Sequence, residues 1–167
     1  KYIRCFGKLM SNISLLKMLL ILFLADYIES LTAPILIKAF ITFPITFLVF
    51  SFSIYRSSSN LSSFFAFFTG LCVDIISDSP IGLNAMLFCL MSYLINSYSN
   101  TFRLFSYLQI CFFFSASSLF FIGFRNLFIN IENFSYLELV ISFAFNSALL
   151  IILSFSRFNL LSNISRR

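Results

Sequence analysis

The chain has 167 residues and a net charge of +5; 60% of its residues are hydrophobic and only 10% are charged. A soluble globular protein of this size is excluded, because much of any folded surface must contact water. The absence of histidine excludes Ser-His triads and most zinc sites. The basic residues are scattered singly, so nucleic acid is not an expected partner. We therefore expect an all-α integral membrane protein that contacts the lipid bilayer.

Apolar stretches follow one another along the chain. At about 20 residues per membrane helix, there is room for about six spans in a single polytopic membrane domain, residues 1–167. Segments rich in Ser, Asn and Pro separate the stretches, and Pro44 is expected to kink the second one. The expected spans are residues 13–31, 35–55, 61–76, 81–98, 105–129 and 137–155.

The distribution of charge predicts the orientation of these spans. With the N-terminus in the cytoplasm, all of the 11 Lys and Arg residues except Lys38 and Arg125 lie on the cytoplasmic side. This pattern obeys the positive-inside rule. The six acidic residues fall toward the opposite side. Because an odd number of spans would break the pattern, both termini are expected in the cytoplasm.

Polar side chains within the apolar stretches are candidate functional residues, since an ionisable group in the membrane costs about 2.5 to 3.5 kcal/mol. In the first stretch, Lys17 is expected to extend its stem toward the cytoplasmic surface, and Asp26 is expected to point inward or to thin the bilayer locally. Asn84, Asn146 and the serine-rich patch at 115–118 are expected to join helices.

The most informative segment is GLCVDIISDSPIGLNA, residues 70–85, where the third span ends and the fourth begins. Asp78 or Ser79 can cap the fourth span by accepting hydrogen bonds from its free N–H groups, and Pro80 suits its first turn. Gly70 and Gly82 allow helix backbones to approach closely. The segment therefore predicts a tight helical hairpin.

Asp74 lies about one turn before the end of the third span. An acidic residue at this depth is a functional-site hypothesis by default. The alternative is structural, with the carboxylate bonded to the N-terminus of the following helix. If hydrogen bonding is its role, an Asp74→Asn variant is expected to keep the fold and the function.

The spacing G-L-x-x-D-x-x-x-x-x-P-x-G-L, with the apolar hairpin around it, resembles the rod shape-determining protein MreD family. Members are small polytopic proteins of the bacterial inner membrane, whose central segment similarly runs from a Gly-Leu pair through an Asp into a turn and a Gly-Leu-x-Ala helix start. Pro34, just before the second span, also resembles a family proline, whereas the Trp often seen in that span is absent. The matching residues are Gly70, Leu71, Asp74, Pro80, Gly82, Leu83 and Ala85.

This resemblance implies a non-catalytic scaffold of the cell-elongation complex, or elongasome, which determines cell shape. The implied partners are MreC, the MreB cytoskeleton, and the glycosyltransferase and transpeptidase of peptidoglycan synthesis. The implied location is the bacterial inner membrane, crossed several times, and no catalytic residue, metal or cofactor is implied. The third and fourth spans would belong to the core that presents a docking face to MreC.

A substrate-binding membrane subunit of a vitamin transporter of the energy-coupling-factor type is the alternative function. Such subunits are also small six-span proteins and are similar to MreD in architecture, so the fold alone does not separate them. They usually carry an Ala-x-x-x-Ala-like stripe on the first helix, whereas here Glu29 lies midway between Ala25 and Ala33. A Mg²⁺-dependent membrane enzyme would need more clustered acids than Asp74 and Asp78. The sequence therefore favours the scaffold.

Overall fold

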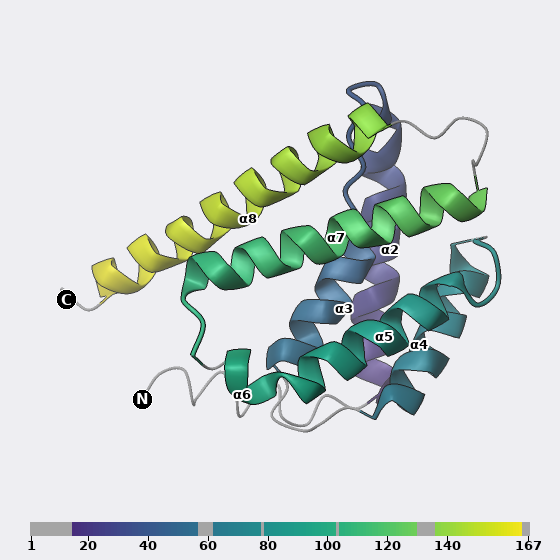
Figure 1. The fold of residues 1–167 in the computed structure, drawn as a ribbon, viewed down its shortest axis with the longest axis horizontal. Helices are drawn as coiled ribbons and strands as arrows, with labels where there is room; N and C mark the ends of the chain where they lie inside the picture. Colours follow the sequence, from purple (N-terminus) through teal and green to yellow (C-terminus); the bar gives the residue numbers. More distant parts are fainter. Residues whose placement is uncertain (1–14, 57–61, 78, 103, 130–135, 165–167) are drawn as a thin grey trace. The chain divides into compact units, whose positions relative to one another are not determined.

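The structure, a computed structural model, describes residues 15–56, 62–77, 79–102, 104–129 and 136–164. Within these ranges the chain forms seven α-helices and no strand (Figure 1). The expected all-α fold class is therefore confirmed for this part of the chain. The helices are α2 (Leu15–Ile37), α3 (Ile45–Arg56), α4 (Ser63–Ile76), α5 (Leu83–Ser97), α6 (Ser99–Phe102), α7 (Tyr107–Ile129) and α8 (Tyr136–Ile164).

The chain divides into two compact units. The first contains the described residues of Lys1–Pro34 and Pro44–Phe102, and therefore most of α2 together with α3, α4, α5 and α6. The second contains the described residues of Ile35–Phe43 and Arg103–Arg167, and therefore the end of α2 together with α7 and α8. Most of the connection between α2 and α3 thus belongs to the second unit together with the last residues of α2, whereas α3 and the rest of α2 belong to the first.

Aromatic packing builds the core of the first unit. Phe50 of α3 stacks on Phe88 of α5 with ring centroids 4.0 Å apart and an interplanar angle of 14°. Both rings are fully buried, and such a pair is worth about 0.5–1.5 kcal/mol beyond its buried area. On another face of α5 lies α4, whose buried residues include Ala66 and Val73. Helix α5 therefore contacts both α3 and α4.

The core of the second unit lies between α7 and α8. Phe112 of α7 meets Phe143 of α8 in a T-shaped contact with centroids 5.7 Å apart. Asn146 Nδ2 donates a hydrogen bond to Ser118 Oγ at 3.0 Å, and both residues are fully buried. The expected helix-joining role of Asn146 and of the serine-rich patch is therefore present as a bond between these two helices.

Two helices of the described part are long and apolar enough to cross a membrane, at Lys17–Ile37 and Leu108–Phe128. The other expected spans contain shorter apolar helices: Ile45–Arg56, Ser63–Ile76, Leu83–Ser97 and Tyr136–Ile152. At about 1.5 Å per residue, the 12 residues of α3 rise about 18 Å, against a hydrocarbon core of about 30 Å. Many large apolar side chains are exposed on these helices, which suits contact with lipid.

The expected break between the first and second stretches is wrong. Helix α2 continues through Pro34, so this proline lies inside the first helix and does not precede the second. Helix α3 begins only at Ile45, directly after Pro44, so Pro44 does not kink it. A proline near the end of a helix removes one backbone hydrogen bond without ending the helix, and a proline before the first turn removes none.

The turn after α2 depends on Phe40. This residue has a positive φ of 55°, and Ile41 N donates to Leu36 O at 3.1 Å across the turn. A left-handed residue with this bonding commonly ends a helix, but Gly or Asn usually occupies the position. A phenylalanine at this position gives no recognisable signal for the end of a helix. The break between the first two apolar stretches was therefore predicted too early in the chain. At the other end of the chain, α8 runs to Ile164, past the expected limit at residue 155.

Candidate functional site

Asp74 lies near the end of α4, where this helix faces the start of α5. Its side chain is 1% exposed. Placing a carboxylate out of contact with water is costly unless hydrogen bonds compensate the charge. The bonds that Asp74 makes therefore decide which role it can have.

Both oxygens of the Asp74 carboxylate accept hydrogen bonds. Oδ1 accepts from Ser79 Oγ and from Asn84 N, each at 2.9 Å. Oδ2 accepts from Gly82 N at 2.8 Å and from Ala85 N at 3.4 Å. Three of these four donors are backbone N–H groups at the N-terminus of α5, which lack partners within the helix and lie at its positive end. A carboxylate from α4 thus caps α5.

This geometry supports the structural alternative for Asp74. Hydrogen bonds to an ionised acceptor are about twice as strong as those between neutral groups, so the four bonds offset much of the cost of burial. The carboxylate also ties the end of one helix to the beginning of the next. The arrangement fixes the angle of the hairpin and requires no proton transfer.

Gly70 brings the backbones of α4 and α5 together. A Cβ atom at this position would lie 2.3 Å from Ala85 Cα and 2.6 Å from Ala85 N. Such distances are far below van der Waals contact, and the atoms met are backbone atoms that cannot rotate away. The close approach expected at Gly70 is therefore present, and only glycine fits there.

The expectation of a close approach at Gly82 is wrong. No atom lies within 4 Å of the place where its Cβ would be. Gly82 is instead the N-cap residue of α5 and has a φ of 98°, a backbone conformation that other residues rarely adopt. The left-handed conformation, rather than a lack of space, accounts for glycine at this position.

The turn of the hairpin also differs from expectation. Pro80 lies before α5, which begins at Leu83, so the proline is not in the first turn of that helix. Ser79 does not serve as the N-cap; its hydroxyl donates to Asp74 and accepts from Asn84 Nδ2 at 3.1 Å. The cap comes from Asp74 because the turn directs the carboxylate of α4 onto the free N–H groups of α5. Asp78 lies outside the described residues.

The remaining residues of the matched segment belong to the same hairpin. Leu83 and Ala85 are buried, and Leu71 is partly exposed. Asn84 is also buried, and both its backbone and its side-chain amide are bonded within the hairpin. The structure therefore brings Asn84 to Asp74, a pairing that the sequence spacing alone did not reveal.

A second capping carboxylate, Glu29, was missed by sequence reasoning. Its Oε2 accepts from Thr46 N at 2.9 Å. Thr46 is the second residue of α3, so the bonded group is again a free N–H at a helix N-terminus. The one available signal was Pro44, since proline is favoured where a helix begins. Nothing in the spacing of the residues pairs the start of α3 with an acid on the preceding helix.

The two charged candidates of the first stretch lie apart from the hairpin cap. Lys17 is exposed near the beginning of α2. Asp26 is half-buried and borders a space between α2 and α4. These positions bring neither residue into the group of bonds around Asp74.

The second unit holds its own partly buried polar contacts. Glu138 Oε1 accepts from Thr42 Oγ1 at 2.5 Å, and Glu138 Oε2 accepts from Asn126 Nδ2 at 3.5 Å. Thr42 N donates to Ser142 Oγ at 2.9 Å. These bonds tie the segment at 35–43 to α8 and connect α8 to α7.

Within the described ranges, no group of three or more His, Cys, Asp or Glu side chains lies close enough together to hold a metal ion. The polar contacts described above all join one helix to another or to a turn. These contacts can hold the ends of helices and pairs of helices in place in the membrane.

Comparison with known families identifies the chain. The family model of rod shape-determining protein MreD matches residues 10–163. Comparison with curated proteins and with solved structures gave no match. MreD proteins are structural membrane proteins that determine cell shape and are not known as enzymes. The match gives no support to the vitamin-transporter alternative. Because it covers nearly the whole sequence, the chain belongs to the MreD family of rod shape-determining membrane proteins.

Proposed function

We propose that the protein is a non-catalytic scaffold of the cell-elongation complex in the bacterial inner membrane. It docks an MreC-like protein and thereby links MreB filaments to the enzymes of peptidoglycan synthesis. The observation that carries this proposal is the family match over residues 10–163. The Asp74 cap adds support, because it gives a fully buried acid of the matched segment a structural role.

The proposed arrangement in the membrane is a single domain with six spans and with both termini in the cytoplasm. Six apolar helices in the described part and the distribution of basic residues support it. The shorter helices would span if the bilayer thins locally around them. A C-terminal fusion to a reporter that fluoresces only in the cytoplasm is expected to be bright. A dark reporter on an inserted protein would contradict this topology.

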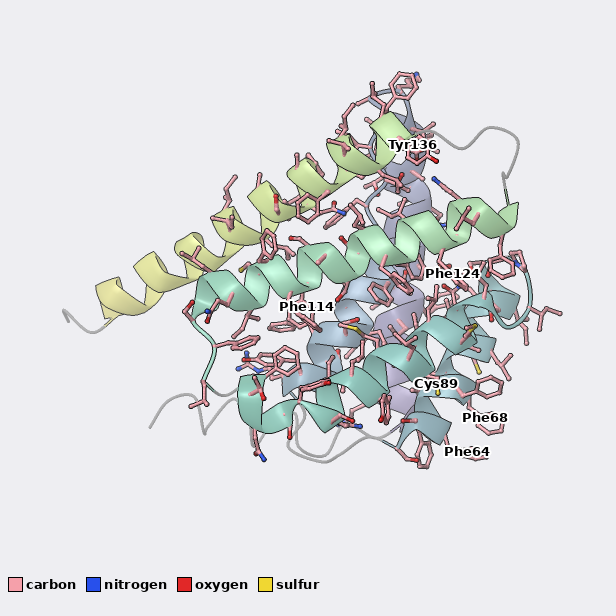
Figure 2. All side chains as sticks on the ribbon, in the orientation of Figure 1. Phe64, Phe68, Cys89, Phe114, Phe124 and Tyr136 are labelled. Carbon is pink, nitrogen blue, oxygen red and sulfur yellow. The ribbon has the colours of Figure 1, made fainter. Side chains whose placement is uncertain are left out.

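The proposed docking surface for MreC is the outer face of α4, defined by Phe64, Phe68 and Ile75. These positions follow one another at helical spacing on the side opposite the buried Val73. All three side chains are exposed, and Phe64 and Phe68 point outward from the helix (Figure 2). The two rings meet in a T-shaped contact with centroids 4.8 Å apart. A rigid aromatic pair is a suitable anchor for a transmembrane helix, because it loses little conformational freedom on binding.

The Asp74 hairpin would hold this surface in place. Gly70 fixes the distance between α4 and α5, and the carboxylate fixes the ends of the two helices. A docking face on α4 therefore keeps its shape without help from a partner. The residues that match the family segment would serve the scaffold by building the hairpin, and not by contacting MreC themselves.

Co-purification tests the proposal. The full chain, extracted in a mild detergent from cells that also express an MreC-like single-span protein, is expected to bring that protein down. A Phe64→Ala variant should lower the recovery about fivefold, the effect of losing a contact worth about 1 kcal/mol. Phe128→Ala on α7 is the matched control, because Phe128 is equally exposed and packs against Phe124 with centroids 4.9 Å apart. The control should recover as much MreC as the parent.

Two outcomes would contradict the proposal. Recovery of an ATPase and a coupling subunit in place of MreC would favour a transporter. Equal loss of MreC in the Phe64 and Phe128 variants would exclude the outer face of α4 as the docking surface. The proposed scaffold function would still be supported by the family match.

A further inference from the structure

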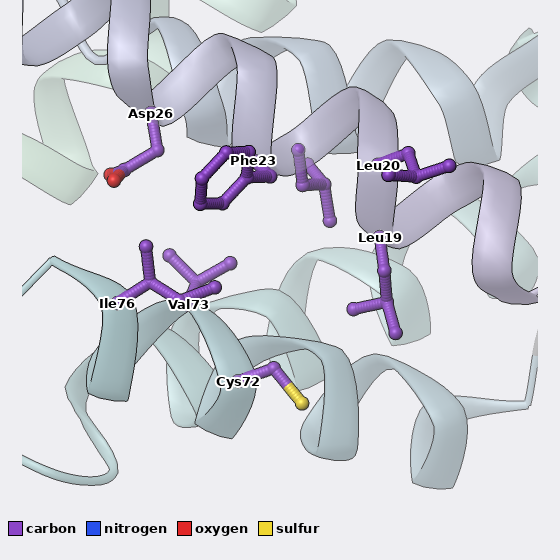
Figure 3. A pocket seen from close by; sticks show the side chains of 8 residues that line it. Leu19, Leu20, Phe23, Asp26, Cys72, Val73 and Ile76 are labelled. Carbon is purple, nitrogen blue, oxygen red and sulfur yellow. The ribbon is translucent and has the colours of Figure 1, made fainter.

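The end of α2 differs in its surroundings from the middle of the same helix. In the middle, Phe23 and Asp26 border the space between α2 and α4 (Figure 3). The last residues of α2 belong instead to the second unit, and Ile35 and Ile37 among them are largely exposed. The end of α2 and the turn that follows it, residues 38–41, therefore form a feature of their own.

The length of α2 places this turn at the surface of the membrane. The part of the helix that is long and apolar enough to cross, Lys17–Ile37, has 21 residues and rises about 32 Å, which matches a hydrocarbon core of about 30 Å. The candidate span in α7 ends beside the same turn, because Glu138 accepts hydrogen bonds from both Thr42 Oγ1 and Asn126 Nδ2. The turn therefore emerges among the lipid head groups.

Hydrogen bonds hold the turn against α8. Ile41 N donates to Leu36 O at 3.1 Å and closes the turn onto the end of α2. The next residue, Thr42, donates from its backbone N to Ser142 Oγ at 2.9 Å and from its hydroxyl to Glu138 Oε1 at 2.5 Å. Both partners lie on one face of α8, since they are one helical turn apart. The direction in which the turn points is therefore set by α8.

Phe40 in this turn has both an unusual backbone and an exposed ring. Its φ of 55° lies in the left-handed region, which bulky residues rarely adopt. Glycine would end the helix at this position without strain. The ring is 61% exposed, so packing within the described part of the chain does not account for an aromatic residue there. At the level of the head groups, the ring can lie against the upper parts of the acyl chains, where its apolar area is removed from water.

Lys38 supplies a cation in the same turn. Its side chain is exposed, and none of the described residues forms an ion pair or a hydrogen bond with it. A lysine at this position also complements the negative C-terminal end of α2, but that interaction leaves the ammonium open to a further anion. The anions available at a membrane surface are lipid phosphates, which attract basic residues.

We propose that residues 38–41 form a lipid anchor. The ring of Phe40 enters the boundary between head groups and acyl chains, and the Lys38 ammonium binds a phospholipid phosphate. An anionic lipid, phosphatidylglycerol, is preferred over a zwitterionic one, because the cationic group of a zwitterionic lipid competes with Lys38 for the phosphate. The bonds of Thr42 to α8 hold the two side chains at this depth. The inference concerns lipid and is independent of MreC docking and of which side of the membrane the turn faces.

The depth of the ring tests the anchor. The chain contains no tryptophan, so Phe40→Trp introduces a single fluorescent reporter into the full chain. In reconstituted vesicles of phosphatidylcholine and phosphatidylglycerol, lipid brominated near the head group is expected to quench it more strongly than lipid brominated near the end of the acyl chain. Phe120→Trp, at an exposed position near the middle of α7, is the matched control and should show the opposite order. The opposite order at position 40, or quenching there by aqueous iodide alone, would overturn the anchor.

Head-group selectivity tests the role of Lys38. With the Phe40→Trp reporter, brominated phosphatidylglycerol is expected to occupy the site about fivefold more than brominated phosphatidylcholine, the effect of one lysine near an anionic surface. Lys38→Gln should reduce this ratio to about one, whereas Lys38→Arg should keep it, because only the charge is at issue. Selectivity that survives Lys38→Gln, or that is absent before this change, would overturn the phosphate site.

The same reporter tests the bonds to α8. Ser142→Ala removes the acceptor of Thr42 N, so the ring should lose its fixed depth and become more accessible to iodide. Ser147→Ala is the matched control, because Ser147 also lies on α8 but donates to Ala144 O within its own helix. Equal quenching in the two variants would overturn the role of α8 in positioning the ring. If Ser142→Ala fails to fold, the Lys38→Gln and Lys38→Arg pair decides the question.

Discussion

The first unit contains two helix junctions at which an acid on one helix caps the next helix. In the α4–α5 hairpin, Asp74 accepts four hydrogen bonds and is almost fully buried. At the α2–α3 junction, Glu29 accepts a bond from Thr46 N and is half-buried. The α4–α5 turn is short, whereas the chain between α2 and α3 passes through the second unit at 35–43.

This difference separates a locally determined junction from one that depends on distant parts of the chain. In the α4–α5 hairpin, the carboxylate, the close backbone contact and the left-handed glycine all lie within residues 70–85. At the α2–α3 junction, the intervening segment is bonded to α8 through Thr42. Substitutions should therefore be most damaging in the hairpin, where several local features support one geometry.

The largest effect is expected at Gly70. In a Gly70→Ala variant the added Cβ would meet Ala85 Cα at 2.3 Å, so α4 and α5 must move apart. Overpacking of this kind costs about 3 kcal/mol or more when backbone atoms are involved. The free energy of unfolding in detergent, measured by titration with SDS, should fall by that amount.

Gly123→Ala on α7 is the matched control for this prediction. A Cβ at Gly123 would meet only the Leu139 side chain, at 3.9 Å, which is an ordinary contact. Alanine is also the better helix former, by up to about 1 kcal/mol. The control should be neutral or slightly stabilising, and equal loss in the two variants would contradict a special role for the α4–α5 contact.

The next largest effect is expected at Asp74. The structure changes the earlier expectation that Asp74→Asn keeps the fold, because an amide has one acceptor oxygen where the carboxylate uses two. Its NH₂ group would face a backbone N–H donor. A buried donor without a partner costs about 1–3 kcal/mol, so the free energy of unfolding should fall by about 2 kcal/mol. SDS titration of the full chain measures this change.

Asp26→Asn serves as the comparison, because it removes the same charge from a half-buried position and should cost less than about 1 kcal/mol. MreC recovery gives the second readout. If Asp74→Asn kept its stability but no longer recovered MreC, the role of the Asp74 charge would be functional and not structural.

The contrast between the junctions also explains what the sequence could predict. The presence of a turn between two helices and the close approach at Gly70 were predictable from sixteen consecutive positions, residues 70–85, whereas the roles expected for Gly82 and Pro80 were wrong. Even so, the capping residue was assigned to Asp78 or Ser79, because local rules favour a cap adjacent to the helix. The Asp74 cap depends on how the turn folds back, and local spacing does not encode that geometry.

The α2–α3 junction was harder to predict for a physical reason. Its helix end depends on Phe40 in a left-handed conformation, and its cap depends on Glu29, an acid within the preceding helix. Neither feature follows a residue preference. The cap joins residues 17 positions apart, and the connecting segment is bonded to α8 through Thr42 and Ser142. Composition predicted apolar helices here correctly but could not place their ends.

The smallest effect is expected at Glu29. In a Glu29→Gln variant the amide oxygen can still accept from Thr46 N, so the main loss is the charge at the positive end of α3. That interaction is worth about 0.5 kcal/mol, and Glu29→Ala, which also removes the acceptor, should cost about 1 kcal/mol. The same SDS titration measures both. If Glu29→Gln were as damaging as Asp74→Asn, the two caps would be equivalent, and the local support around Asp74 would not be the source of its larger effect.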